Sequence, residues 1–310
     1  MSDSFFSSLV STLNSGQKCR VAVPLANDDA CAYAICHAVK TGILQATLIG
    51  DTEQIKTMYG EIARHEMVRI INETDEKKAC AMAVREVREG RCDILMKGMV
   101  ATSTLLKAVL NTNEGLRKNP ILSHLTFFEF PGQPGLKILT DAAMCIAPDE
   151  ETLIKEIDNA VEAYAMFADH APKVALLAAN EKVSEKVPST VLGDKVAKAL
   201  AGRQNMIVEG PISFDLAVSR ESAEIKKYHG KIQGNADIFV VPRLDTGNAF
   251  YKALQYYVKA AMGGLVYGAS CPVVLTSRAD DNSTKFNSLL LGIVLWQRST
   301  GKENNSQTRN

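Results

Sequence analysis

Short apolar runs of β-type residues alternate with helical patterns along most of this chain. Arg20 to Pro24 is typical of a strand, Asn27 to Asp29 supplies a cap, a helical pattern runs from Ala30 to Gly42, and Ala46 to Ile49 is again a strand. A strand, a helix and a second strand in this order favour a parallel sheet. The alternation recurs after Pro172, so we predict an α/β fold with mostly parallel sheets.

The alternation is interrupted once, which suggests where one domain ends. At 310 residues the chain exceeds the usual size of a single domain, so two domains are expected. From Ile121 to Thr140, aromatic and β-type runs flank a Pro/Gly turn, which predicts either an antiparallel hairpin or an excursion from the alternating pattern. We place the crossing to the second domain near residue 128. Later, a strongly helical run from Ala249 to Met262 is expected to end at Gly263 and Gly264.

Composition and the N-terminal sequence indicate which partners and which cellular location to expect. Lys plus Arg and Asp plus Glu both number 35, so the overall charge indicates neither a nucleic acid nor a membrane as partner. The seven cysteines lack CxxC spacing, which is typical of reduced thiols rather than of disulfides or a zinc site. The N-terminus lacks the pattern of a signal peptide, and no apolar run approaches the roughly 18 residues that span a bilayer. We therefore expect a cytoplasmic protein.

Polar side chains gather at three strand ends, the first of which follows the expected strand Asp93 to Met96. Lys97, Gly98, Thr102 and Ser103 occupy the turn between that strand and the next helical pattern. Free amide groups at a helix N-terminus, with a lysine and hydroxyls, form a cradle for an anion. The alternative is a lysine at a sheet edge, with Thr102 or Ser103 as the helix N-cap.

The second polar strand end is the stretch C-P-V-V-L-T-S-R-A-D-D, from Cys271 to Asp281. An apolar run from Pro272 to Leu275 predicts a short buried strand before the next helix. The polar side chains that follow the run are Thr276, Ser277, Arg278, Asp280 and Asp281. Ligands of open parallel sheets bind outside the carboxyl ends of the strands, which favours a site here. The alternative is a simple turn, with Asp281 or Ser283 as N-cap and a solvated Arg278.

The third polar strand end follows the expected strand Ala236 to Val241. It is the stretch Pro242 to Asn248, which contains Asp245, Gly247 and Asn248 ahead of the long helical run.

Several common site signatures are absent from the sequence, so the reactions that depend on them are not expected. The motifs of dinucleotide-binding sites, P-loops, HExxH metalloproteases and α/β-hydrolases do not occur. The five histidines show no ligand-like spacing, so no metal site is predicted. Cations, hydroxyls and carboxylates without a metal cluster suit an anionic ligand such as phosphate, held by Lys97 and by a bidentate Arg278.

The motifs at these strand ends resemble those of the phosphate acetyltransferases and phosphate butyryltransferases. The matching segments are G-N-A-D-I-F-V-V-P-R-L-D-T-G-N-A-F-Y-K (Gly234 to Lys252), P-V-V-L-T-S-R-A-D (Pro272 to Asp280), D-I-L-M-K-G-M-V-A-T-S-T-L-L (Asp93 to Leu106) and L-T-D-A-A-M (Leu139 to Met144). The likeness extends through almost the whole chain with order and spacing kept. It is therefore far more specific than any single motif.

The resemblance implies a fold, a reaction and a set of ligands. It implies two α/β domains around a cleft, of the isocitrate/isopropylmalate dehydrogenase type, with residues 1–127 and 264–310 in the first domain and 128–263 in the second. It implies transfer of an acyl group between coenzyme A and inorganic phosphate, with acyl-CoA, phosphate and acyl phosphate as small-molecule partners. Coenzyme A is then a substrate, no tightly bound cofactor is expected, and a homodimer is expected. The S-R-A-D motif and the short N-terminus resemble the butyryl and branched-chain members more than the acetyl-specific ones.

The resemblance also suggests roles for single residues. Ser277 and Arg278 would receive the phosphate that leaves when a coenzyme A thiolate attacks an acyl phosphate directly in a ternary complex. Lys97, Gly98, Thr102, Ser103, Asp141, Asp245, Gly247 and Asn248 would contribute to substrate binding. Free thiols titrate near about 8.5, so a carboxylate base would help to form the thiolate.

Two departures from the family pattern affect the assignment of a base and a nucleophile. The carboxylate proposed as base in acetyltransferases lies six residues after the arginine, where this chain has Thr284, which leaves Asp280 and Asp281 as candidates. Both could instead cap the helix or pair with the arginine. The cysteine of the family's D-C-A motif is replaced by Ala142, so an acyl-enzyme is not expected. An alternative to an enzyme is a non-catalytic acyl-CoA-binding regulatory protein of the same fold.

Overall fold

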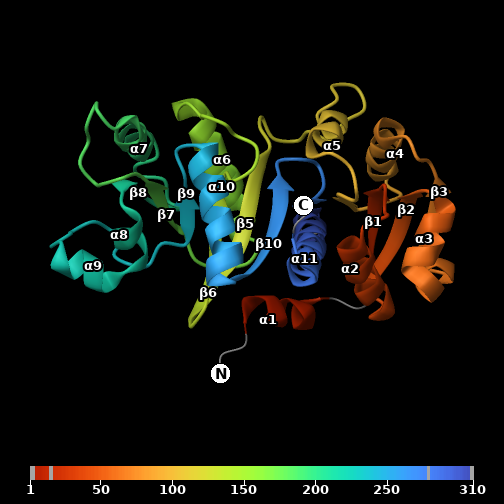
Figure 1. The fold of residues 1–310 in the computed structure, drawn as a ribbon. Coiled ribbons are helices and arrows are strands. Elements are labelled where there is room, and N and C mark those ends of the chain that lie inside the picture. The colour runs from red at the N-terminus through yellow and green to blue at the C-terminus, as the bar shows by residue number, and fades with distance from the viewer. Residues whose placement is uncertain (1–3, 14–16, 278–279, 308–310) are drawn as a thin grey trace. The chain divides into compact units, whose positions relative to one another are not determined.

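The chain divides into two compact units. The computed structural model describes residues 4–13, 17–277 and 280–307. Unit 1 consists of Met1–Pro120 together with Ala261–Asn310, and unit 2 consists of Ile121–Ala260. Figure 1 shows that each unit combines helices with strands. The domain boundaries expected after residues 127 and 263 stay a prediction.

Unit 1 is built from both ends of the chain. Its elements are α1 (Phe5–Thr12), β1 (Cys19–Pro24), α2 (Asp29–Lys40), β2 (Leu44–Gly50), α3 (Thr52–Tyr59), η1 (Gly60–Arg64), β3 (Val68–Asn72), α4 (Glu76–Arg88), β4 (Ile94–Met96), α5 (Thr102–Val109), β10 (Ala261–Tyr267), β11 (Val273–Val274) and α11 (Asn282–Gln307). The order of its strands is β3-β2-β1-β4-β11-β10. Neighbours from β3 to β11 run parallel, and β10 is antiparallel to β11. The predicted α/β class with a mostly parallel sheet is confirmed.

Local sequence explains how the helices of unit 1 begin and pack. The cap expected around Asp28 is confirmed, because its side chain accepts a 2.8 Å hydrogen bond from the amide of Cys31 at the start of α2. The strands β1 and β4 are almost wholly buried, as expected for a parallel sheet covered on both faces. Figure 1 shows α4 and α5 on one side of β1 and α2 and α11 on the other.

Unit 2 begins with the hairpin that the sequence predicted. Its elements are β5 (Ser123–Phe130), β6 (Gln133–Thr140), α6 (Glu150–Tyr164), β7 (Lys173–Leu177), α7 (Pro188–Ala199), β8 (Ile207–Ile212), α8 (Phe214–Val218), α9 (Arg220–Ile225), β9 (Ile238–Val240), α10 (Leu244–Ala253) and η2 (Leu254–Val258). The strand order is β5-β6-β9-β7-β8, in which only the β5–β6 pair is antiparallel. Buried aromatic rings, including Phe127, Phe128 and Phe239, fill its core.

The expected helix from Ala249 to Met262 is wrong at both ends. Helix α10 already begins at Leu244, the chain leaves helical geometry after η2, and β10 begins at Ala261. Gly263 therefore lies inside a strand rather than in a break. A Cβ atom at Gly263 would lie 2.9 Å from the amide nitrogen of Ser288 in α11. Glycine at this position allows α11 to pack closely on β10, and local propensity does not reveal such a contact between distant segments.

Every helix in the described ranges is too short or too polar to cross a lipid bilayer.

Candidate active site

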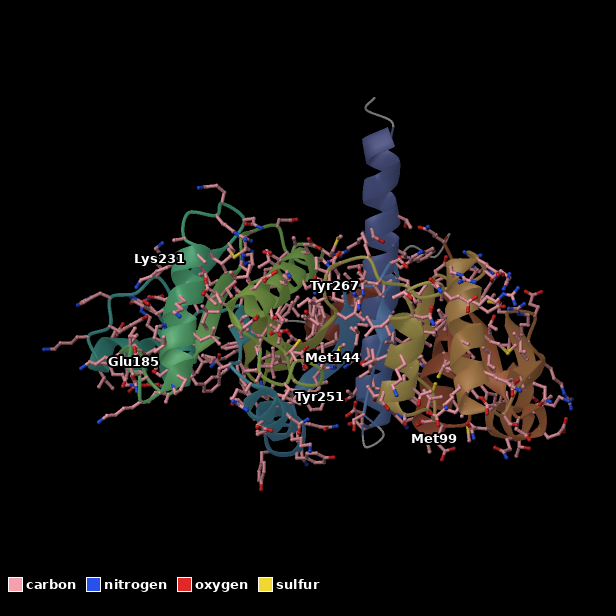
Figure 2. All side chains as sticks on the ribbon, turned by 90° about the horizontal axis from the view of Figure 1, so that it is seen from above. Met99, Met144, Glu185, Lys231, Tyr251 and Tyr267 are labelled. Atoms are coloured by element: carbon pink, nitrogen blue, oxygen red, sulfur yellow. The ribbon has the colours of Figure 1, made fainter. Side chains whose placement is uncertain are left out.

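Two of the three predicted polar strand ends belong to unit 1 and lie at one edge of its sheet. Because β1, β4 and β11 are parallel neighbours, the loops that follow them emerge together. The amide of Lys97 donates a 2.9 Å hydrogen bond to the carbonyl of Val274, and the amide of Met99 donates a 2.8 Å bond to the carbonyl of Leu25. Figure 2 labels Met99, whose exposed side chain marks the loop between β4 and α5. The structure thus brings the Lys97 turn next to the end of β11.

Lys97 and Gly98 are held in tightly packed surroundings. Lys97 is only 6% exposed, and its Nζ donates a 3.4 Å hydrogen bond to the carbonyl oxygen of Gly98. A Cβ atom at Gly98 would lie 2.3 Å from the carbonyl oxygen of Pro24 and 2.5 Å from that of Leu25. Only glycine allows the β4 loop to lie against the end of β1 at this distance.

The loop that follows β11 shows different surroundings for its two aspartates. Asp280 is buried, and its Oδ2 accepts a 2.6 Å hydrogen bond from the amide of the exposed Ser277. Asp281 is exposed, and its Oδ1 accepts a 2.8 Å bond from the amide of Thr284, as a helix cap does. Arg278 lies outside the described residues.

The two hydroxyl residues of the β4 loop are at the start of α5 but do not cap it. The N-cap is Ala101, whose amide donates a 2.7 Å hydrogen bond to Oε1 of Glu76. Thr102 is half-buried and Ser103 is exposed. The hydroxyls are therefore not used as the N-cap that the alternative interpretation assigned to them.

Sequence patterns missed a buried ion pair at this edge of unit 1. Nζ of Lys285 in α11 donates hydrogen bonds of 2.7 and 2.8 Å to the two carboxylate oxygens of Asp28, which follows β1. Burial alone would raise the pKa of Asp28, but the bonds from Lys285 and from the amide of Cys31, with the charge of Lys97, hold that pKa below its ordinary value. Asp28 therefore carries a negative charge, which is paired with Lys285 and further stabilised by the charge of Lys97.

In unit 2, Asp141 organises the loop that follows β6. Its carboxylate accepts hydrogen bonds of 2.7 Å from the amide of His124, 2.7 Å from that of Ala143 and 2.8 Å from that of Met144. Met144 is labelled in Figure 2. Three backbone amides already donate hydrogen bonds to this buried carboxylate, so Asp141 holds the conformation of the loop that follows β6.

The third polar strand end lies against this same loop. A Cβ atom at Gly247 in α10 would lie 2.3 Å from the carbonyl oxygen of Asp141, so glycine is needed for the contact. Nδ2 of Asn248 donates a 3.4 Å hydrogen bond to the carbonyl of Ala142. Asp245 is exposed in the first turn of the helix. Asp141, Gly247 and Asn248 are thus brought together within unit 2.

A buried acid beneath the Asp141 loop was also missed by sequence reasoning. Glu156 of α6 is completely buried. Burial, with the nearby charge of Asp141, raises the pKa of Glu156 to about 8, although the Cys145 thiol opposes the shift in part. Burial, Glu156 and Asp141 likewise raise the pKa of Cys145 well above its ordinary value, so this thiol is protonated at neutral pH.

Replacing Glu156 with glutamine is expected to remove a pH dependence of folding stability. The native state keeps the Glu156 proton up to about pH 8, whereas the unfolded chain loses it above its ordinary pKa of about 4.3. The native state therefore binds more protons in this window, and the free energy of unfolding falls as pH rises, by about 1.4 kcal/mol per pH unit at most. Urea denaturation at pH 5 and pH 8 should show a smaller loss for Glu156→Gln than for the wild type.

The exposed Glu151, on the same helix, provides the control for this measurement. Glu151→Gln should lose as much stability between the two pH values as the wild type does. An equal loss in Glu156→Gln would show that Glu156 is ionised in the native state.

Among the described residues, no group of three or more His, Cys, Asp or Glu side chains could hold a metal ion.

Comparison with known proteins gives one consistent result. The model of the phosphate acetyl/butaryl transferase family matches residues 64–293. A phosphate butyryltransferase from Clostridium acetobutylicum is 37% identical over 94% of this chain and 97% of its own length. A phosphate acetyltransferase from Thermotoga maritima is 34% identical over 90% of this chain and 96% of its own length. The crystal structure of a branched-chain phosphotransacylase from Enterococcus faecalis superposes with a TM-score of 0.82 at 36% identity, covering 90% of this chain and 99% of that one.

Proposed function

The chain belongs to the phosphate acetyl/butaryl transferase family, and from that premise we propose that it transfers a short acyl group between coenzyme A and inorganic phosphate. The observation that carries the proposal is the 37% identity to a phosphate butyryltransferase over 97% of that enzyme's length. Release of coenzyme A thiol from butyryl-CoA and acetyl-CoA should depend on added phosphate. Absence of turnover with every short acyl-CoA would contradict the proposal, and binding of acyl-CoA without turnover would favour a regulatory protein.

The preferred acyl group is proposed to be butyryl or a branched chain. Support comes from the butyryltransferase at 37% identity and the branched-chain transacylase at 36%. One methylene group is worth about 1–3 kcal/mol in an apolar pocket, so chain-length preferences should be clear in kcat/KM. A panel of acyl-CoA substrates at fixed phosphate measures them, and a preference for acetyl-CoA would overturn this part of the proposal.

The proposed mechanism is a direct transfer in a ternary complex. The thiolate sulfur of coenzyme A bonds to the carbonyl carbon of the acyl phosphate, and the bond from that carbon to the phosphate oxygen breaks, leaving its electron pair on phosphate. Lys97 and Arg278 are the cations proposed to stabilise the leaving phosphate, with Ser277 beside them. The raised pKa of Cys145 argues against this thiol as an alternative nucleophile in an acyl-enzyme.

The thiol proton is proposed to pass to Asp280 or Asp281. Asparagine keeps a side-chain oxygen that can accept the hydrogen bond from the amide of Ser277, at position 280, or cap α11, at position 281. Asp280→Asn and Asp281→Asn therefore change the ionisation of these side chains more than the structure. The variant that loses the base should show kcat lower by about 10²–10⁴-fold. Steady-state kinetics with butyryl-CoA measures this, and wild-type kcat in both variants would remove both residues as bases.

The proposal extends to the finer organisation of the protein. We propose that the chain forms two domains of the isocitrate/isopropylmalate dehydrogenase type, with residues 1–127 and 264–310 in one and 128–263 in the other. We also propose that the protein is a homodimer. Light scattering of the purified protein would measure the oligomeric state, and a monomer at working concentration would contradict the dimer.

A further inference from the structure

The buried ion pair between Asp28 and Lys285 joins residues that are 257 positions apart in the sequence. The Lys285 side chain is 4% exposed and the Asp28 side chain 11% exposed. Taking both charges out of water is costly, and apolar residues of similar volume often stabilise a fold as well as a buried pair does. Such a pair is better explained by what it positions than by the stability that it adds.

The contacts of the pair show what it holds in place. Asp28 lies between β1 and α2 and caps α2 through the amide of Cys31. Lys285 lies in the first turn of α11, directly after the loop that carries Ser277 and Asp280. The pair therefore ties the start of α11 to the start of α2, in the connection that follows β1.

The other end of the same loop is held by backbone contacts. The amide of Lys97 bonds to the carbonyl of Val274 in β11, which fixes that strand beside β4. Between these two attachments, the amide of Ser277 bonds to the carboxylate of Asp280 at 2.6 Å. Ser277 consequently lies between two attachments, one from Val274 to β4 and one from Lys285 to the start of α2.

We propose that Asp28 and Lys285 form a positioning pair for the phosphate site, which fixes the loop carrying Ser277 relative to Lys97. The inference rests on the proposed function, because phosphate is the ligand that these groups would receive. Lys285 acts through the loop and through Asp28, since its ammonium group is occupied by both carboxylate oxygens. Loss of the pair should weaken phosphate binding and leave acyl-CoA binding intact.

The test compares Lys285→Met with the double variant Asp28→Asn/Lys285→Met. The single variant leaves a buried carboxylate without its ammonium partner, so it is expected to be less stable. The double variant removes both charges and keeps an asparagine that can cap α2, so it should fold. In both variants the KM for phosphate should rise by about 10- to 100-fold, because a displacement of about 1 Å has effects of this size. The KM for butyryl-CoA should not change.

The matched control is Arg20→Met, which breaks another ion pair between β1 and the β4 region. Arg20 bonds to Asp93 through Nε at 2.8 Å and Nη2 at 2.6 Å, at the opposite ends of the strands. This variant should lose stability and keep the wild-type KM for phosphate. A wild-type KM for phosphate in the double variant would overturn the inference, because the pair would then serve stability alone.

A second readout separates this inference from the proposed function. Added inorganic phosphate should raise the melting temperature of the wild type and should do so less in the double variant. Failure of the wild type to turn over any acyl-CoA would reject the proposed function only. An equal phosphate-induced shift in wild type and double variant would reject the positioning pair, whatever the turnover.

Discussion

Replacing Lys97 with methionine is expected to lower kcat/KM for phosphate by about 10²–10³-fold, with little change in the melting temperature. Lys97 lies at the edge where β1, β4 and β11 end, and it is nearly buried, so its charge acts where water screens it little. Asp28 already has Lys285 as a partner, so removal of Lys97 does not leave that carboxylate without a cation. Steady-state kinetics at varied phosphate, with thermal denaturation of the same preparations, measures both expectations.

Arg278→Ala should have a similar effect, with a raised KM for phosphate and a lowered kcat, if two cations share the leaving phosphate. Lys107→Met, which removes an exposed lysine of α5, is the control and should behave as the wild type. Unchanged KM for phosphate in both Lys97→Met and Arg278→Ala would remove the proposed phosphate site from this edge of unit 1.

Replacing Gly98 with alanine is expected to destabilise the protein by about 1–3 kcal/mol and to lower kcat/KM by about 10²-fold. The added Cβ would lie 2.3 Å from the carbonyl oxygen of Pro24, and that oxygen belongs to the backbone at the end of β1. The contact can be relieved only if the β4 loop moves away from β1, which displaces Lys97. Urea denaturation and steady-state kinetics measure the two effects.

Gly301→Ala is the matched control, because a Cβ atom at Gly301 in α11 would have no neighbour within 4 Å. This variant should be as stable as the wild type or slightly more so, since alanine favours a helix more than glycine does. Wild-type stability in Gly98→Ala would show that the β1 and β4 loops can separate without cost.

The sequence predicted what depends on local pattern. The β-α-β opening, a cap within Asn27 to Asp29 and the hairpin of β5 and β6 all follow from hydrophobic period and turn residues, and all are confirmed. The strand β10 was missed because Gly263 and Gly264 resemble a helix break. In the structure, Gly263 instead makes room for α11, which packs closely on β10. A glycine chosen for a distant contact has no local signature.

The candidate site was predictable to the same extent. Lys97, Gly98 and the β11 loop could be chosen because polar residues at the ends of parallel strands converge. Lys285 could not be chosen, because inside a helical pattern it is one lysine among many, and its partner is 257 residues away. Glu156 is one of several acidic residues in the sequence of α6, and only the packing of this helix buries it and raises its pKa.

Unit 1 contains the first 120 residues and the last 50, with unit 2 between them. During synthesis on a ribosome, β4 has β1 as a neighbour early, but β11 leaves the ribosome only after all of unit 2 has been made. One edge of β4 thus stays open for much of translation, and an open strand edge is a site where chains associate wrongly. Unit 2, whose strands follow one another without interruption, can finish folding first although it is made second.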